Sequence, residues 1–232
     1  MSATELFIAL FRAVKIKDFR WWPEFGSFEV VVGAILIQNT AWSNADAALQ
    51  NLRSKGLLSL DGIAGLDEAE LAEIIKVSGF YNQKARRLNS LCKAIIADFE
   101  NFESFKAGVS REWLLARKGI GAESCDAILC YACERAVMVA DSYSVRLLGA
   151  LSYEFESYDE LSAWLGELEF ERIYEFVNFA NFPCDAAAKA EKLENENGVY
   201  ALFHGLIVEF CKAHLKSKIF DDFAMEFFDN LK

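Results

Sequence analysis

One aspartate in this chain stands where a carboxylate could do chemistry. Residues 137–140 are apolar, and Asp141 follows them at the head of the sequence Asp-Ser-Tyr-Ser-Val-Arg. An ionised carboxylate can stabilise a developing positive charge, and it can orient or deprotonate an attacking water. An acidic residue after an apolar run can also be the N-cap of a helix, a role that suits Ser142 and Ser144 as well. Taken alone, Asp141 is best interpreted as a cap.

A glycine turn between two helical patterns is the second feature that could serve a ligand. The sequence Lys118-Gly119-Ile120-Gly121 separates the helical patterns of residues 111–117 and 123–133. Glycine permits positive φ and close backbone approach, and the following helix directs its free N–H groups toward the turn. A phosphate could therefore bind there without a basic side chain. The motif alone favours a simpler interpretation, a tight turn between two helices.

The net charge of the chain is −11. This argues against a broad nucleic-acid-binding surface, because neutralising phosphates requires clustered lysine and arginine. Backbone amides and a helix dipole can nevertheless hold a phosphate on an acidic protein. Local basic residues could help, although each by itself is best interpreted as solvated surface: Lys84, Arg86, Arg87, Arg117 and Lys118.

The elements that must position these residues are predicted to be helices. The chain has only two prolines, Pro23 and Pro183, and its apolar residues recur at helical spacing, most clearly between Leu88 and Phe99. Residues 28–37 are rich in β-branched side chains, which are typical of a buried strand. No partner strand is evident, so we predict a buried helix there.

Helix boundaries are also visible in the sequence. Asp67 and Ser157 each precede a glutamate by three positions, which is the pattern of a capping box. Ser43 could cap a further helix, for which Gly56 would be the stop.

Taken together, these features resemble the helix–hairpin–helix DNA glycosylase superfamily typified by endonuclease III. Its members carry a G-[IV]-G hairpin and, 22 residues after the first glycine, an aspartate in a V-D-[TS]-x-x-x-R setting. Here Asp141 lies 22 residues after Gly119. The segments 36–40 and 78–85 resemble two further family patterns, L-x-x-Q-x-T, whose Q-x-T part is matched by Gln38 and Thr40, and G-[LFY]-Y-x-x-K-A. The resemblance is strong over roughly residues 27 to 147.

The resemblance implies an all-α fold with two helical lobes, a helix–hairpin–helix motif and a cleft between the lobes. Residues 27–133 would form a barrel-like lobe that ends in the hairpin. Residues 1–26 and 134–232 would form the second lobe, which carries the catalytic Asp141.

The resemblance also implies roles for individual residues. Asp141 would be the catalytic carboxylate, supported by Tyr143 and Arg146, and Gln38 would enter the space left by an extruded nucleotide. The remaining contacts to DNA would come from the hairpin and the start of its second helix, at Lys118, Gly119, Ile120, Gly121, Glu123 and Ser124.

Departures from the family patterns refine the expected activity. Lys118 replaces a proline that only stiffens the turn. Glu123 stands where the lyase members place a lysine, so the chain lacks an obvious Schiff-base nucleophile and we expect no AP-lyase activity.

The cysteines argue against a cofactor. The family's iron–sulfur cluster needs four closely spaced C-terminal cysteines, and only Cys184 and Cys211 occur there, so we expect neither cluster nor metal. The others, including the Cys130-x-x-Cys133 pair, are interpreted as reduced, buried thiols.

A narrower resemblance suggests the substrate. The Trp21-Trp22-Pro23 run and the aromatic Trp42 after Gln38-Asn39-Thr40 resemble the bacterial 3-methyladenine DNA glycosylases of endonuclease III type, which also lack the cluster. In that subgroup the residues matching Trp22 and Trp42 line the base pocket. An N3-alkylated purine is cationic while attached to its sugar, and indole faces attract cations by about 0.5–2 kcal/mol per contact. Each tryptophan alone could equally be a core or lobe-interface aromatic.

The expected function is therefore monofunctional excision of alkylated purines from duplex DNA. The alternatives are a glycosylase for oxidised pyrimidines or mismatched adenine, a non-catalytic helix–hairpin–helix DNA-binding protein, or a helical interaction protein. The longest apolar run, residues 30–37, is too short to span a bilayer, and no secretory signal is evident. We expect a cytoplasmic, nucleoid-associated monomer without membrane contact.

Overall fold

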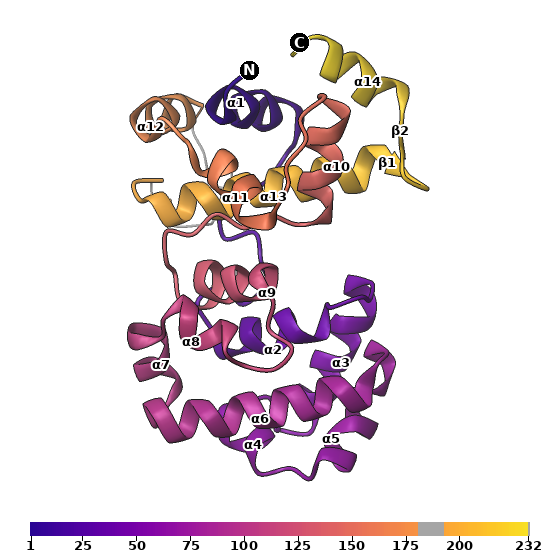
Figure 1. Ribbon diagram of the computed structural model, residues 1–232, viewed down its shortest axis with the longest axis vertical. Coiled ribbons are helices and arrows are strands. Elements are labelled where there is room, and N and C mark those ends of the chain that lie inside the picture. Colours follow the sequence, from indigo (N-terminus) through magenta and orange to yellow (C-terminus); the bar gives the residue numbers. More distant parts are fainter. Residues whose placement is uncertain (181–192, 232) are drawn as a thin grey trace. The chain divides into compact units, whose positions relative to one another are not determined.

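The computed structural model describes residues 1–180 and 193–231, and in this part of the chain the fold is all-α (Figure 1). Pro183 and Cys184 lie outside the described residues. Two compact units are present: residues 24–134, called the 24–134 unit, and residues 1–23 with 135–232, called the terminal unit. The sequence-based boundaries were 27 and 133, and the cleft expected between lobes stays a prediction.

The 24–134 unit is built around its first helix. Its elements are α2 (Phe28–Leu36), α3 (Trp42–Ser54), α4 (Leu60–Ala64), α5 (Glu68–Ile74), the 3-10 turn η1 (Lys76–Ser78), α6 (Tyr81–Phe99), α7 (Phe102–Gly108), α8 (Arg111–Leu115), α9 (Ala122–Ala127) and the π-helix η2 (Ile128–Ala132). Helix α2 packs against α3, α6, α9 and η2, while α4 and α5 lie against α6 (Figure 1). Because α2 meets neighbours on several sides, almost all of its side chains are apolar and buried. The prediction of a buried helix at 28–37 is confirmed.

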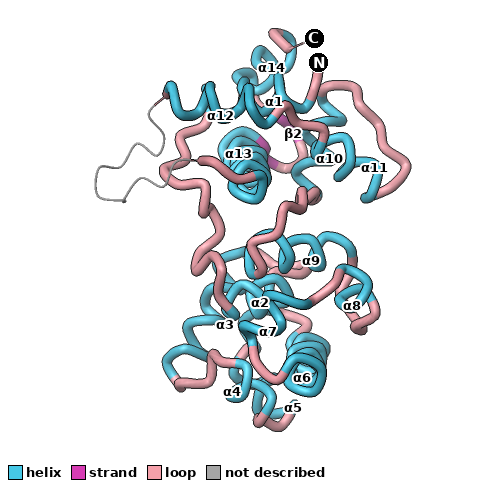
Figure 2. The backbone as a smooth tube through the Cα atoms, turned by 90° about the vertical axis from the view of Figure 1, so that its left-hand side faces the viewer, coloured by secondary structure: helices cyan, strands magenta, loops and turns pink. Residues whose placement is uncertain are grey.

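The terminal unit is organised around a long helix near the C-terminus. Its elements are α1 (Ala3–Ala13), α10 (Ser142–Ala150), α11 (Tyr158–Gly166), α12 (Phe170–Phe179), α13 (Glu196–His214), the two-stranded pair β1 (Leu215–Lys216) and β2 (Ile219–Phe220), and α14 (Asp222–Asp229). Figure 2 looks along α13, around which α1, α10 and α12 pack. The core of this unit is a single apolar cluster to which all six of its described helices contribute.

Helix boundaries follow the expected caps with one exception. Asp67 accepts a hydrogen bond from the Ala69 N–H, and Ser157 accepts one from the Glu160 N–H, so both are N-caps, but neither helix start forms the full capping box. Ser43 is not a cap, because α3 begins one residue earlier at Trp42 and its N-cap, Ala41, makes no side-chain hydrogen bond. The sequence alone could not show which residue is the N-cap, because Ser43 lies only two positions after Ala41 and has the more favourable side chain for a cap.

None of the described helices is both long enough and apolar enough to cross a membrane.

Candidate active site

Asp141 begins helix α10, and one of its two oxygens does all the capping. Its Oδ1 atom accepts hydrogen bonds from the Tyr143 N–H (2.9 Å), the Ser144 N–H (2.8 Å) and the Ser144 hydroxyl (3.1 Å). The Ser144 hydroxyl also lies 3.3 Å from the Asp141 N–H, which completes a capping box. The cap predicted for Asp141 is therefore present, and it occupies Oδ1 alone.

The other oxygen of Asp141 faces a histidine from helix α13. Asp141 Oδ2 lies 3.7 Å from Nε2 of His204, and the two side chains are 14% and 5% exposed. Burial raises the pKa of the Asp141 carboxyl, but His204 and the hydrogen bonds from Ser144 lower it by more, so the net pKa lies below its ordinary value. Asp141 is thus a largely buried carboxylate that stays ionised at neutral pH.

Aromatic rings continue this arrangement from His204 to the predicted base-pocket residue Trp22. Trp21 meets the His204 ring edge-on at 5.7 Å, and Trp22 meets Trp21 edge-on at 6.2 Å. Gly205 makes room for this packing, because a Cβ atom there would lie 2.7 Å from Trp21 Cγ. Trp22 is buried, with 8% of its surface exposed. Within the terminal unit, Asp141 and Trp22 therefore belong to one continuous cluster.

The predicted glycine hairpin is present in the 24–134 unit, between α8 and α9. Gly119 has φ +89°, which favours glycine, and a Cβ atom there would lie 2.1 Å from Nε of Arg87, so another residue would also displace the Arg87 side chain. Gly121 has ordinary φ as the N-cap of α9, and a Cβ atom there would meet nothing within 4 Å. The second helix changes at Ile128 into η2, a π-helical turn that the regular apolar pattern of 123–133 did not predict.

Gln38 is held against this hairpin. Its side-chain amide donates hydrogen bonds to the Gly119 carbonyl (3.0 Å) and to the Ser124 hydroxyl (2.9 Å). Arg87, on α6, donates to Gln38 Oε1 at 2.7 Å. The structure thus brings three predicted DNA-contact residues together, and it adds Arg87 as the residue that joins them.

A buried lysine supports the segment that carries Gln38. Lys84 is 1% exposed, and its ammonium donates to the carbonyls of Leu36 (2.8 Å) and Ser78 (2.7 Å). Burial, with a smaller contribution from Arg87, lowers the pKa of Lys84 to about 8. Lys84 therefore serves the fold by pairing the carbonyl at the end of α2, and its interpretation as solvated surface is wrong.

The remaining predicted residues lie as follows. Lys118 and Glu123 are exposed on the hairpin, and Ile120 is buried beneath it. Trp42 is half-buried at the first position of α3. In the terminal unit, Tyr143 contributes its backbone N–H to Asp141, whereas Arg146 is exposed on α10.

His204 and Trp21 were given no site role in the sequence-based analysis, and Arg87 was named there only among the basic residues that could help to hold a phosphate. A signal was present, because α13 is apolar on most of its faces and His204 stands between Phe203 and Ile207, where a polar side chain needs a polar partner.

Among the described residues, no group of three or more His, Cys, Asp or Glu side chains is arranged to bind a metal ion. The five described cysteines are buried. Burial raises the pKa of Cys92, Cys125 and Cys211 to about 12, so these thiols are un-ionised. The absence of an iron–sulfur cluster stays a prediction, because Cys184 lies outside the described residues.

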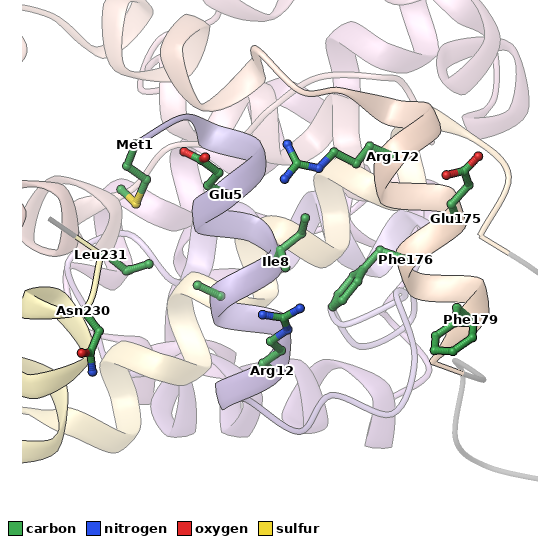
Figure 3. A pocket seen from close by; sticks show the side chains of 11 residues that line it. Met1, Glu5, Ile8, Arg12, Arg172, Glu175, Phe176, Phe179, Asn230 and Leu231 are labelled. Atoms are coloured by element: carbon green, nitrogen blue, oxygen red, sulfur yellow. The ribbon is translucent and has the colours of Figure 1, made fainter.

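A separate pocket of about 920 Å³ lies in the terminal unit between α1 and α12 (Figure 3). Arg12 and Ile8 of α1 face Phe176 of α12, with the Arg12 guanidinium 5.3 Å from the ring of Phe176. None of the predicted site residues lines this pocket, and its Glu5 carboxylate already caps α1 through Ser2. The candidate active site therefore remains the Asp141 cluster together with the hairpin.

Comparison with known proteins places these features in a family. Residues 32–178 match the HhH-GPD superfamily of base excision DNA repair proteins. A candidate DNA repair glycosylase of Methanocaldococcus jannaschii is 37% identical over 209 residues, which is 87% of this chain and 84% of the relative.

Two solved structures extend the likeness to nearly the whole chain. The H. pylori 3-methyladenine DNA glycosylase bound to 1,N6-ethenoadenine is 40% identical, with a TM-score of 0.83 over 93% of this chain and 100% of that one. A non-covalent endonuclease III–DNA complex is similar in fold, at 15% identity and a TM-score of 0.66 over 94% and 86% of the two chains.

Proposed function

Because the chain belongs to the HhH-GPD superfamily and is a DNA glycosylase of base excision repair, we propose that it hydrolyses the N-glycosidic bond of alkylated purines, above all 3-methyladenine. The observation that carries this proposal is the 40% identity with a 3-methyladenine glycosylase across nearly the full length of both chains. The two indoles at Trp22 and Trp42 support it, since electron-rich rings attract a cationic base.

Asp141 supplies the charge that the reaction needs. When the bond between C1′ and the purine nitrogen breaks, its electron pair leaves with the base, and the sugar acquires oxocarbenium character. The ionised carboxylate stabilises that cation and accepts the proton of the water that adds to C1′. A purine alkylated at N3 is already cationic, so it leaves without prior protonation. The products are the free base and an abasic site in an uncut strand.

The 24–134 unit holds the DNA in this proposal. The exposed, unobstructed backbone at Gly121 and the N–H groups that begin α9 bind a phosphate. Gln38, which lies against the same hairpin, fills the gap left in the base stack when the lesion rotates out. A phosphate held mainly by backbone groups is consistent with a chain whose net charge is −11.

The proposal includes the absence of lyase chemistry. Glu123 occupies the first turn of α9, where the lyase members carry an amine. Strand cleavage through a Schiff base requires that amine. Treatment of the protein and abasic DNA with borohydride is therefore expected to trap no covalent adduct. The proposed partner is duplex DNA that contains alkylated bases, bound by a monomer in the cytoplasm.

The test is chromatography of the free bases released from alkylated duplex DNA. Wild-type protein is expected to release 3-methyladenine, and Asp141→Asn is expected to lose at least about 100-fold in rate. Asparagine caps helices as well as aspartate does, so this variant removes the charge and keeps the cap. The matched control is Asp221→Asn, which changes the aspartate that caps α14. Release of oxidised pyrimidines instead of alkylated purines would contradict the proposed substrate.

A further inference from the structure

Both histidines of α13 face an aspartate that caps a helix. His204 Nε2 lies 3.7 Å from Oδ2 of Asp141, and His214 Nδ1 lies 3.0 Å from Oδ2 of Asp221. The surroundings differ, because the first pair is 5% and 14% exposed and the second is 24% and 47% exposed. Water screens the outer pair, whereas the inner pair interacts through a medium of low polarity.

In the Asp141–His204 pair, the two carboxylate oxygens of Asp141 have different surroundings. The Tyr143 and Ser144 groups that satisfy the start of α10 all bind Oδ1 of Asp141. Oδ2 is therefore not needed for the cap, and it faces the imidazole. A polar contact of 3.7 Å is long for a hydrogen bond, but catalytic contacts in proteins without substrate are often long and tighten in the complex.

His204 itself is held in place from its other side. The edge-on Trp21 ring packs against the imidazole, and the indole N–H of Trp21 is anchored by a hydrogen bond to Glu209 Oε1 at 3.1 Å. Gly205, the next residue on α13, lets Trp21 approach this closely. A ring fixed by packing can hold the group it faces in one orientation, which is what a reacting carboxylate requires.

We propose that His204 is a positioning residue that orients Oδ2 of Asp141 during base excision. The inference rests on the proposed function and deepens it. His204 touches neither base nor sugar in this proposal. It acts through Asp141, and it links that carboxylate to the aromatic cluster that contains Trp22.

The experiment compares two replacements of His204 in single-turnover release of 3-methyladenine from alkylated duplex DNA. His204→Leu removes the polar nitrogen and is expected to slow release at least about tenfold. His204→Gln keeps a side-chain N–H near the position of Nε2 and is expected to retain a rate within about threefold of wild type. Neither change is expected to alter the Kd for DNA by more than about twofold. His214→Leu, the matched control on the same helix, is expected to leave the rate unchanged.

A double-mutant cycle with Asp141→Asn separates positioning from any independent role. If His204 acts only through the carboxylate, His204→Leu costs nothing further once Asp141 is neutral. An equal loss in both backgrounds would overturn the inference, as would an unchanged rate in His204→Leu. Equal losses in the leucine and glutamine variants, together with a lower Tm, would identify His204 as packing alone.

Two safeguards keep the outcome decisive. If His204→Leu does not fold, His204→Asn replaces it, because the shorter amide places its donor away from Oδ2 and is expected to be slower than His204→Gln. If wild-type protein releases no alkylated purine, the proposed function fails. If wild type is active, Asp141→Asn is inactive and His204→Leu is as fast as wild type, only the positioning inference fails.

Discussion

The side-chain amide of Gln38 lies 3.0 Å from the carbonyl oxygen of Gly119, although the two residues are 81 positions apart in the chain. The residue proposed to fill the gap in the base stack is thus attached to the turn proposed to hold a phosphate. Arg87 completes the attachment from α6 by donating to Gln38 Oε1. Because all three residues belong to the 24–134 unit, they form one preorganised cluster at the surface proposed to contact DNA.

The first prediction concerns Arg87. Arg87→Met removes a charged donor from Gln38, and a hydrogen bond of that kind contributes about 1.5–3 kcal/mol. We expect DNA binding to weaken by about tenfold, with an unchanged slope of log Kd against log salt concentration, because Arg87 acts on Gln38 and not on phosphate. Arg86→Met is the control, since Arg86 is the exposed neighbour of Arg87 and pairs with Glu68. A slope reduced by about 1 would instead place Arg87 on a phosphate.

The two hairpin glycines provide the second prediction. Gly119→Ala combines positive φ with a clash against Arg87, so we expect it to lower the free energy of unfolding by more than about 1 kcal/mol. Gly121→Ala meets only open space and is expected to leave stability unchanged. If a phosphate lies against Gly121, the methyl group of Gly121→Ala weakens DNA binding even though stability is unchanged. Urea unfolding and DNA titration of both variants separate these effects, and full binding by Gly121→Ala would count against phosphate contact there.

The sequence predicts the local features of this protein well because they depend on neighbouring residues. The periodic apolar residues of α6 and the buried segment of α2 both appear where expected. The cap at Asp141 follows from its local sequence, whereas the catalytic role proposed for it follows from the resemblance to the glycosylase family. The partners of these residues were not predictable, because Arg87 reaches Gln38, and His204 reaches Asp141, only through the packing of separate helices.

The third prediction is a pH dependence of stability that involves Lys84. Burial and Arg87 lower its pKa to about 8 in the folded protein, against about 10.4 in an unfolded chain. Between these values the unfolded chain holds a proton that the folded one has lost, so the stability from Lys84 rises with pH across that window. Lys84→Met leaves two buried carbonyls unpaired, at about 1–3 kcal/mol each. We therefore expect it to be destabilised, and by more at pH 9.5 than at pH 7.

Urea unfolding at the two pH values measures this difference. Lys93→Met is the control, because Lys93 lies on the same helix and is exposed. A destabilisation of Lys84→Met that is equal at both pH values, or that shrinks as the pH rises, would contradict the assigned shift.

The last prediction distinguishes a base-binding tryptophan from one that merely packs. Trp42 is half-buried at the start of α3, so part of its indole remains available to a ligand. Trp42→Leu removes the aromatic face that would attract a cationic base, a loss of about 0.5–2 kcal/mol or about 2- to 30-fold in rate. Trp42→Phe keeps an aromatic ring, and its rate is expected to lie between those of the wild type and Trp42→Leu. A neutral base such as 1,N6-ethenoadenine gains little from the cation–π interaction, so its binding should weaken less. Equal losses for charged and neutral bases would mean that Trp42 contributes shape and packing, and that the preference for a cation arises elsewhere.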